Sequence, residues 1–232
     1  MSTITDPEFG EITVRRVARA RYVRIMIGND GRYVATVPPL TPLLFVRQMI
    51  ERSRSELRKL AHSAGQSQPY TWGQQIGKQH TLVHVPTTMV KQPHVQLLSD
   101  KIVVKLPPNH SVNDRDVQQM IRDVVAKVYR KEAKLLLPSR LERIAADRGF
   151  TYTTIRFSHS TGRWGSCSSR GVISLNIALM KLPDTLIDYV LVHELCHTRE
   201  MNHSPAFWRE VEAIDPLYLT HRKLLKKHSP AV

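Results

Sequence analysis

Three histidines and one glutamate lie close together near the carboxyl end of this sequence, as His193-Glu194-Leu195-Cys196-His197 followed by His203. Residues four positions apart lie on one face of an α-helix, so His193 and His197 point the same way. Two imidazoles one helical turn apart can hold one zinc ion, at about 2.0–2.1 Å each. Glu194 is placed to act on a water at the metal rather than to bind the metal. The spacing therefore predicts one Zn²⁺ per chain, with Glu194 as the general base.

We expect the third ligand to be His203, which follows His197 by six positions. This is the spacing of the third histidine in the metzincin pattern H-E-x-x-H-x-x-G-x-x-H. Glu200 stands where that pattern has glycine, so the chain has to turn by other means. We expect the helix to end near Glu200 and Asn202 to adopt the left-handed conformation in its place. Ser204-Pro205 is typical of the start of the next helix, with a serine cap and proline at the first position.

Glutamates on that next helix are the alternative source of the third ligand. In gluzincin-like sites this ligand is a glutamate on a later helix, and Glu210 and Glu212 lie on such a helix. The metzincin spacing and the helix start at Ser204-Pro205 favour His203 over both.

A zinc ion with three neutral ligands keeps its double charge and one open position for water. The pKa of that water falls from about 15.7 toward about 7, and Glu194 can take its proton and pass it to a leaving amine. Further residues are candidates for stabilising the transition state or orienting a ligand: Tyr189, Glu200, Arg163 and His159. Tyr189 has an alternative interpretation as a core tyrosine, and Glu200 as a solvated charge.

The elements that position these residues belong to an α+β fold. Residues 1–106 contain alternating segments typical of strands and one helix, from about residue 42 to 61. We place a domain junction near residue 110, after Pro107-Pro108-Asn109, which gives a β-rich N-terminal domain (1–110) and a catalytic domain (111–232). In the second domain we expect one helix to residue 136 and another from Pro138 to Arg148, closed by Gly149. The sequence shows no internal repeat.

Composition gives the broad class. The chain has 232 residues, of which 41% are hydrophobic and 23% charged, as in ordinary globular proteins. A net charge of +14 favours polyanionic partners such as nucleic acid, and the tail contributes Arg222, Lys223, Lys226 and Lys227. Two cysteines imply no disulfide framework, and neither a signal peptide nor a membrane-spanning run is evident. A cytoplasmic location without membrane association is the expectation.

Several motifs in the second half resemble the YgjP-like family of bacterial zinc metallopeptidases and, more distantly, the SprT-like proteases. They are Arg163-Trp164-Gly165-Ser166-Cys167-Ser168-Ser169, Ile173-Ser174-Leu175-Asn176, the helix from Ile187 to His197, and Asn202-His203-Ser204-Pro205-Ala206-Phe207-Trp208. The resemblance implies a zincin-like catalytic domain with three histidine ligands. By the same resemblance, the strand formed by Val172, Ile173, Ser174, Leu175 and Asn176 is the edge on which an extended peptide would pair.

The expected function is therefore hydrolysis of peptide bonds in a peptide or an unfolded protein, with action near nucleic acid as a further expectation. The alternative is a metal-dependent hydrolase of another substrate, such as a nucleotide phosphoanhydride, which would use the same activated water. A binding module with a structural metal is a third possibility, but Glu194 beside an incomplete ligand set argues against it.

Overall fold

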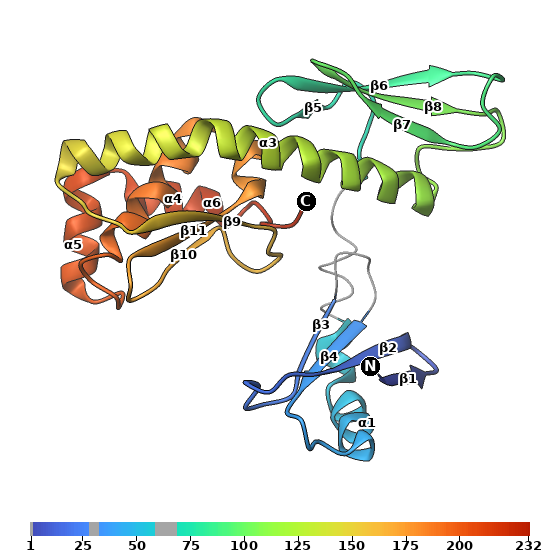
Figure 1. Cartoon of the computed structure of the whole chain (residues 1–232), viewed down its shortest axis with the longest axis horizontal. Helices are drawn as coiled ribbons and strands as arrows, with labels where there is room; N and C mark the ends of the chain where they lie inside the picture. The colour runs from blue at the N-terminus through green and yellow to red at the C-terminus, as the bar shows by residue number, and fades with distance from the viewer. Residues whose placement is uncertain (1, 28–32, 59–68) are drawn as a thin grey trace. The chain divides into compact units, whose positions relative to one another are not determined.

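The computed structural model describes residues 2–27, 33–58 and 69–232. It divides into two compact units, Met1–Gln68 and Pro69–Val232, each of which is described by itself (Figure 1). This division differs from the junction that we predicted near residue 110. The reason is that the strands between residues 75 and 106 share one hydrophobic core with the long helix that follows them, so they belong to the second unit. The mixture of helices and small sheets confirms the predicted α+β class.

The first unit is a four-stranded sheet with a helix on one face. The strand order is β1-β2-β4-β3, in which β2 and β4 are parallel and the outer pairs antiparallel. Alternate residues of β2 and β4 are buried against α1, as the two-residue period of a strand requires. The last residues of the predicted helix, beyond residue 58, lie outside the described residues. The elements are β1 (Ser2–Asp6), β2 (Gly10–Arg16), β3 (Arg24–Ile27), β4 (Tyr33–Val37) and α1 (Leu43–Arg52).

The second unit begins with a sheet of the same design. Its order is β5-β6-β8-β7, with β6 and β8 parallel and the outer pairs antiparallel, and it packs on the first half of α3. The elements are β5 (Gln75–Ile76), β6 (His80–Pro86), β7 (His94–Leu97), β8 (Lys101–Leu106) and α3 (Arg115–Arg148).

The two sheets reveal an internal repeat that we did not expect from the sequence. Strand order and strand directions are the same in both, and a helix follows the fourth strand in each. Each fourth strand ends in a hydrophobic residue and two prolines, at 37–39 and 106–108. The helices then share the pattern V-x-Q-M-I at 46–50 and 117–121, whose first and last residues are buried in both copies. The chain therefore contains one β-sheet and helix unit twice.

α3 is one helix of 34 residues with Pro138 inside it, so the predicted break at that proline is wrong. A proline within a helix removes one backbone hydrogen bond and costs about 3 kcal/mol. Here Leu137 and Leu141 beside it are fully buried in the core, and Lys134, whose carbonyl loses its partner, is exposed to water. Core packing therefore keeps the helix continuous. It ends at Gly149, whose φ of 66° confirms the predicted C-cap.

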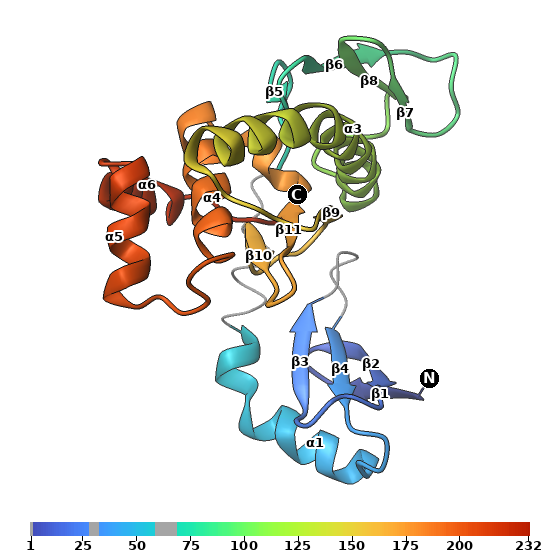
Figure 2. The ribbon, with the colours of Figure 1, turned by 60° about the vertical axis from the view of Figure 1, so that its left-hand side comes forward.

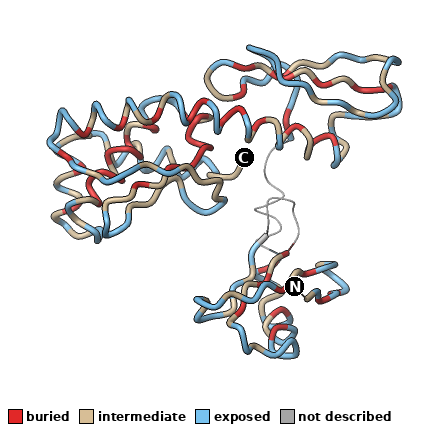
Figure 3. The backbone as a smooth tube through the Cα atoms, in the orientation of Figure 1, coloured by how far each residue is buried: buried red, intermediate tan, exposed pale blue. Residues whose placement is uncertain are grey.

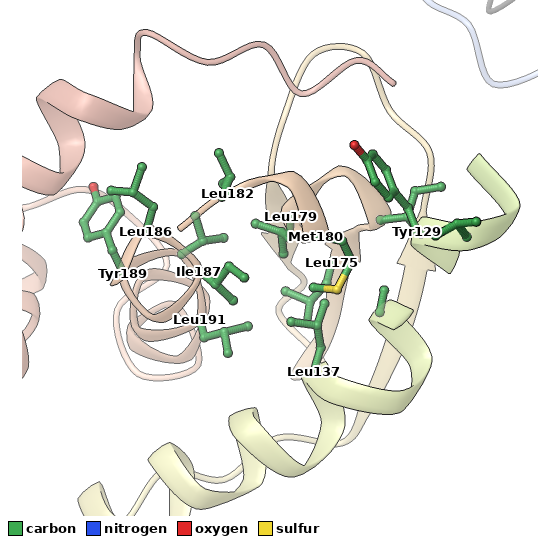
Figure 4. Close-up of a cluster of buried hydrophobic side chains, with 14 of the residues drawn as sticks. Tyr129, Leu137, Leu175, Leu179, Met180, Leu182, Leu186, Ile187, Tyr189 and Leu191 are labelled. Carbon is green, nitrogen blue, oxygen red and sulfur yellow. The ribbon is translucent and has the colours of Figure 1, made fainter. Parts of the chain in front are cut away.

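The remaining elements form the half of the second unit that holds the predicted metal site. A three-stranded sheet of order β10-β11-β9 lies beside α4, and α4 also contacts α3, α5 and α6 (Figures 1 and 2). Leucine and isoleucine side chains from these segments and from α3 form the core between them (Figure 4). Buried positions recur along the same segments (Figure 3). The elements are β9 (Thr154–Ser158), β10 (Gly165–Cys167), β11 (Val172–Asn176), the 3₁₀ helix η1 (Ile177–Lys181), α4 (Asp184–Cys196), α5 (Pro205–Ile214) and α6 (Tyr218–Leu225).

The buried carboxylate of Glu132 connects the second copy of the repeat to the start of α4 through hydrogen bonds. Glu132 of α3 accepts hydrogen bonds from the backbone N–H groups of Lys78 (2.8 Å) and Gln79 (3.3 Å) and lies 3.1 Å from Nδ1 of His80. The ammonium group of Lys78 then donates to the carbonyl of Leu182 (2.8 Å), immediately before α4. The turn between β5 and β6 therefore contacts the segment that leads into α4. Among the described residues, no helix is long and apolar enough to span a bilayer.

Candidate metal centre

α4 carries the predicted H-E-x-x-H motif at its carboxyl end. Its residues from Leu186 to Val192 are apolar on nearly every side, because α3, β10, α5 and α6 all pack around it. A helix enclosed in this way holds its last turn in a fixed place. His193 and Glu194 lie in that turn, and His197 is the C-cap residue directly after it.

Three imidazoles converge at this point. One ring nitrogen from each of His193, His197 and His203 lies within 4.8 Å of the others. The Nε2 atoms of His193 and His203 are 3.1 Å apart. Nitrogen ligands of a tetrahedral zinc ion, each at about 2.0–2.1 Å from it, lie about 3.3 Å from one another. The donor set therefore fits a metal ion, although these distances alone do not select the element.

Aromatic rings enclose the three histidines. Phe207 of α5 is fully buried, and its ring lies 4.5 Å from that of His197 and 5.0 Å from that of His193. Trp208 stacks on His203 at 5.5 Å. Burial lowers the pKa of His193 to about 3, and the nearby positive charges of His197, His203 and Arg222 add to this effect. The imidazole is thus held in the neutral form that binds metal ions.

The orientation of His197 is set by a backbone carbonyl. Its Nδ1 lies 3.0 Å from the carbonyl oxygen of Glu200. Because a carbonyl can only accept, Nδ1 carries the proton and Nε2 is left free for a metal. We predicted that Glu200 could orient a ligand histidine, and the residue does lie beside one. The contact is made by the main chain, however, so it does not depend on the carboxylate.

The turn before His203 differs from our prediction. α4 ends at Cys196 rather than near Glu200, and the chain unwinds through successive turns up to residue 200. No residue other than glycine has a positive φ among those described, so Asn202 is not left-handed. Since the helix ends four residues earlier, a gradual turn replaces the sharp one. The predicted start of the next helix is confirmed: Ser204 caps α5 through a hydrogen bond from the N–H of Phe207, and Pro205 is its first residue.

Glu194 is enclosed between α4 and β10. Its side chain is 5% exposed, and its Oε2 has no hydrogen-bond partner within the described residues. Gly165 of β10 lies directly against it, since a Cβ atom there would be 2.5 Å from Oε1 of Glu194. Burial raises the pKa of Glu194 to about 8, and the positive charge of Arg163 opposes the rise. A buried carboxylate oxygen without a partner, next to three converging imidazoles, is typical of a hydrolytic metal centre.

Comparison with known proteins agrees with this geometry. The family model described as "YgjP-like, metallopeptidase domain" matches residues 21–228. The chain belongs to the YgjP-like family. It therefore carries the metallopeptidase domain of that family, as the sequence motifs indicated.

One solved structure resembles part of this YgjP-like chain. It is the metallopeptidase zymogen of Pyrococcus abyssi abylysin, which has 28% sequence identity, covers 38% of this chain and 90% of its own, and superimposes with a TM-score of 0.35. No curated protein matches the chain.

The glutamates considered as alternative ligands lie elsewhere in this YgjP-like domain. Glu210 accepts a hydrogen bond of 2.6 Å from Arg199, which also donates to the carbonyls of Arg148 and Gly149 at the end of α3. Glu212 is exposed on α5. Neither belongs to the cluster of possible ligand atoms found among the described residues.

The other predicted site residues differ in whether the structure brings them to the metal centre. The ring of Tyr189 is buried one turn before His193, at 6.1 Å between ring centroids, and burial raises its pKa to about 12. Arg163 is exposed and acts electrostatically on Glu194. His159 instead experiences the charges of Arg130 and Asp123 on α3, so the structure does not bring it to the metal centre.

β11 is not a substrate edge, which corrects our prediction for residues 172–176. It pairs with β10 on one side and with β9 on the other, so its backbone hydrogen-bonding groups are already used. The edge strand beside Glu194 is β10, which pairs only with β11. Any extended peptide that adds to this sheet near Glu194 therefore meets Gly165–Cys167.

The roles of three residues at the site were not predicted from the sequence. Arg222 of α6 lies 4.6 Å over the ring of Trp208, and its charge lowers the pKa of His193 and of His203. Buried Asn176 donates to the carbonyls of Ser160 (2.6 Å) and Arg163 (2.9 Å) and so holds the loop that leads into β10. Gly165 is a glycine, as a close approach requires, but nothing in the sequence identified Glu194 as its neighbour.

Proposed function

We propose that the protein is a zinc endopeptidase in which His193, His197 and His203 hold one zinc ion and Glu194 is the general base. One observation carries the proposal: three ring nitrogens converge within 4.8 Å beside a buried carboxylate oxygen that has no partner among the described residues. Two helical histidines leave a tetrahedral zinc two positions short, and His203 supplies one of them. When bound, zinc supplies Lewis acidity, which lowers the pKa of water and polarises a carbonyl group.

Glu194 is suited to proton transfer because it is held and shielded. Its carboxylate lies against Gly165 on one side and is kept from solvent, so it has one position rather than many. A carboxylate in this position takes a proton from the attacking water and delivers it to the leaving amine. Zinc binding itself is left to the three imidazoles.

We further propose that β10 is the strand on which the substrate pairs. A peptide that adds to an edge strand must be extended, which selects unfolded segments over folded domains. Gly165 at the start of β10 adds no side chain, so a peptide carbonyl can approach Glu194 closely. The charge of Arg163, which precedes β10, acts on Glu194, and that of Arg222, beside Trp208, acts on His193. Both are therefore candidates for stabilising the negative charge that develops on that carbonyl oxygen.

The test of these roles is Glu194→Gln in the zinc-loaded full-length chain. The amide keeps the shape but cannot accept the proton, so zinc content should remain one per chain while cleavage of an unfolded protein falls by about 10²–10⁴-fold. Loss of zinc from this variant would mean that Glu194 is a ligand and would overturn the assignment. The same preparation is assayed with nucleoside triphosphates, because two arginines near the centre also suit a phosphoanhydride. Turnover of nucleotides but not of peptides would favour that alternative.

Nucleic acid is the second element of the proposal, and the net charge of +14 supports it. A peptidase whose positive charge attracts it to nucleic acid would cleave protein substrates that are bound to the nucleic acid. Single-stranded DNA should then raise the cleavage rate of a DNA-bound protein at low salt. An identical rate with and without DNA would count against this element alone.

A further inference from the structure

The open face of the sheet in the first unit carries a row of arginines. Ile12 and Val14 of β2 are buried against α1, so Arg15, at the next outward position, lies on the opposite face. In the register of the sheet, Arg15 lies beside Thr36 of β4, and Thr36 lies beside Arg24 of β3. Both arginines are exposed. Two guanidinium groups therefore flank a small polar residue across three strands.

The loop between β2 and β3 extends this surface. It contributes Arg19 and Arg21, which are exposed, and Tyr22, whose side chain is 82% exposed. We call these two residues and Tyr22, together with Arg15 and Arg24, the arginine surface. The ring of Tyr22 is so exposed that packing within its own unit does not stabilise it, and it lies among four arginines.

No acidic side chain among the described residues pairs with any of these four arginines. Glu11 lies on the same face of β2, four residues before Arg15, but does not pair with it. Other acidic groups among the described residues of this unit are occupied elsewhere. Asp6 and Glu8 form ion pairs with Arg54, and Glu8 also pairs with Arg58. The positive charge of the arginine surface is thus left for a partner.

The second copy of the repeat carries basic residues at equivalent positions. Lys91 and His94 each lie 70 positions after Arg21 and Arg24, and Lys105 lies 69 positions after Thr36. His94 and Lys105 are direct neighbours in the register of β7 and β8, as Arg24 and Thr36 are in the first copy. Two of the four arginines, Arg21 and Arg24, thus have basic counterparts in the second copy, whereas Arg15 and Arg19 correspond to Val85 and Met89.

We propose that the arginine surface binds single-stranded nucleic acid, with the arginines on phosphates and Tyr22 stacked on a base. Guanidinium groups match phosphate oxygens with paired hydrogen bonds, and a tyrosine ring stacks on any unpaired base. In duplex nucleic acid the bases are already stacked, so Tyr22 would find no free base there. This inference locates the nucleic-acid element of the proposed function and is independent of peptide hydrolysis.

The first experiment measures binding of a fluorescent oligothymidylate of about 20 nucleotides to the full-length chain, between about 50 and 200 mM salt. The test variant is Arg15→Gln with Arg24→Gln. Each phosphate contact on a single strand adds about 0.7 to the slope of log affinity against log salt. Losing two contacts should lower that slope by about 1.4 and raise Kd about 25-fold at 0.1 M salt. The matched control is Arg47→Gln with Arg52→Gln, which removes the same charge from exposed positions on α1.

A second experiment separates stacking from charge. Tyr22→Phe should bind as the wild type does, whereas Tyr22→Ser should raise Kd about fivefold or more with the same salt slope. A duplex of the same length should not respond to either change at Tyr22. An oligouridylate measured in parallel distinguishes RNA from DNA as the preferred strand.

Three outcomes would overturn the inference: equal weakening by the Arg47 and Arg52 control pair, full affinity in the Arg15 and Arg24 variant, or no effect of Tyr22→Ser on the single strand. In each of these cases the wild type still binds, so the nucleic-acid element of the proposed function survives. If the wild type binds no oligonucleotide at about 50 mM salt, both fail together.

Discussion

Replacing Gly165 with alanine should disable the metal centre without touching a ligand. The new Cβ would lie 2.5 Å from Oε1 of Glu194 and 2.7 Å from its Cδ and Cγ, whereas ordinary contact begins at 3.4 Å. The carboxylate must therefore move by roughly 1 Å, and a displacement of that size can cost about 100-fold in rate. Because Glu194 is buried, part of the conflict remains as strain, and overpacking of this kind costs about 1–3 kcal/mol in stability.

The assay compares kcat/KM on an unfolded protein substrate, zinc content and the free energy of unfolding. Gly162→Ala is the control, since Gly162 lies in the loop just before β10, does not have a left-handed φ, and has no atom within 4 Å of its added Cβ. Repeating Gly165→Ala in the Glu194→Ala background removes the clash, so the loss of stability should largely disappear there. A Gly165→Ala enzyme with full activity, or an equal loss of stability in both backgrounds, would refute the reasoning.

Two further predictions concern the third ligand and a buried lysine. His203→Ala should lower zinc affinity by well over the ~10–100-fold that is typical when a residue hydrogen-bonded to a ligand is replaced. Glu210→Ala should leave zinc affinity near that of the wild type. Competition with a chelator measures both affinities, and the reverse pattern would indicate a gluzincin arrangement. Burial lowers the pKa of Lys181 to about 8, from 10.5 in the unfolded chain. Between pH 8 and pH 10.5 the unfolded state therefore binds more protons than the folded state, and the free energy of unfolding rises with pH. Lys181→Met should lack that rise in urea titrations at pH 8 and pH 10, and an unchanged pH dependence would contradict the prediction.

The parts of the site that the sequence predicted are those with local causes. The common face of His193 and His197 follows from helical periodicity, and the start of α5 follows from the chemistry of Ser204-Pro205. His203 joined the cluster through its spacing, although the turn before it was predicted wrongly. That turn depends on where α4 stops, which is decided by packing around the helix rather than by Glu200 or Asn202.

The parts that the sequence did not predict depend on contacts between distant segments. β11 was predicted to be an edge from the family resemblance. The sequence did not reveal β10 beside it, because β10 is only three residues long and contains glycine, serine and cysteine, which carry little strand signal. Arg222 reaches the centre only because α6 folds back onto Trp208. The repeat was missed because the two copies share a strand order and a few helix residues, and strand order is not visible in a single sequence.

The length of the helix in each copy of the repeat has a consequence for how such a protein can change over evolutionary time. In the first copy the helix stops after ten residues, and the unit is complete by itself. In the second copy it continues to 34 residues, and Glu132, beyond the repeated part, joins the sheet to the start of α4 through Lys78. Substitutions in the second copy can therefore alter the position of α4, which carries the candidate metal ligands. The first copy can instead accumulate substitutions, acquire a new partner or change its specificity without altering α4.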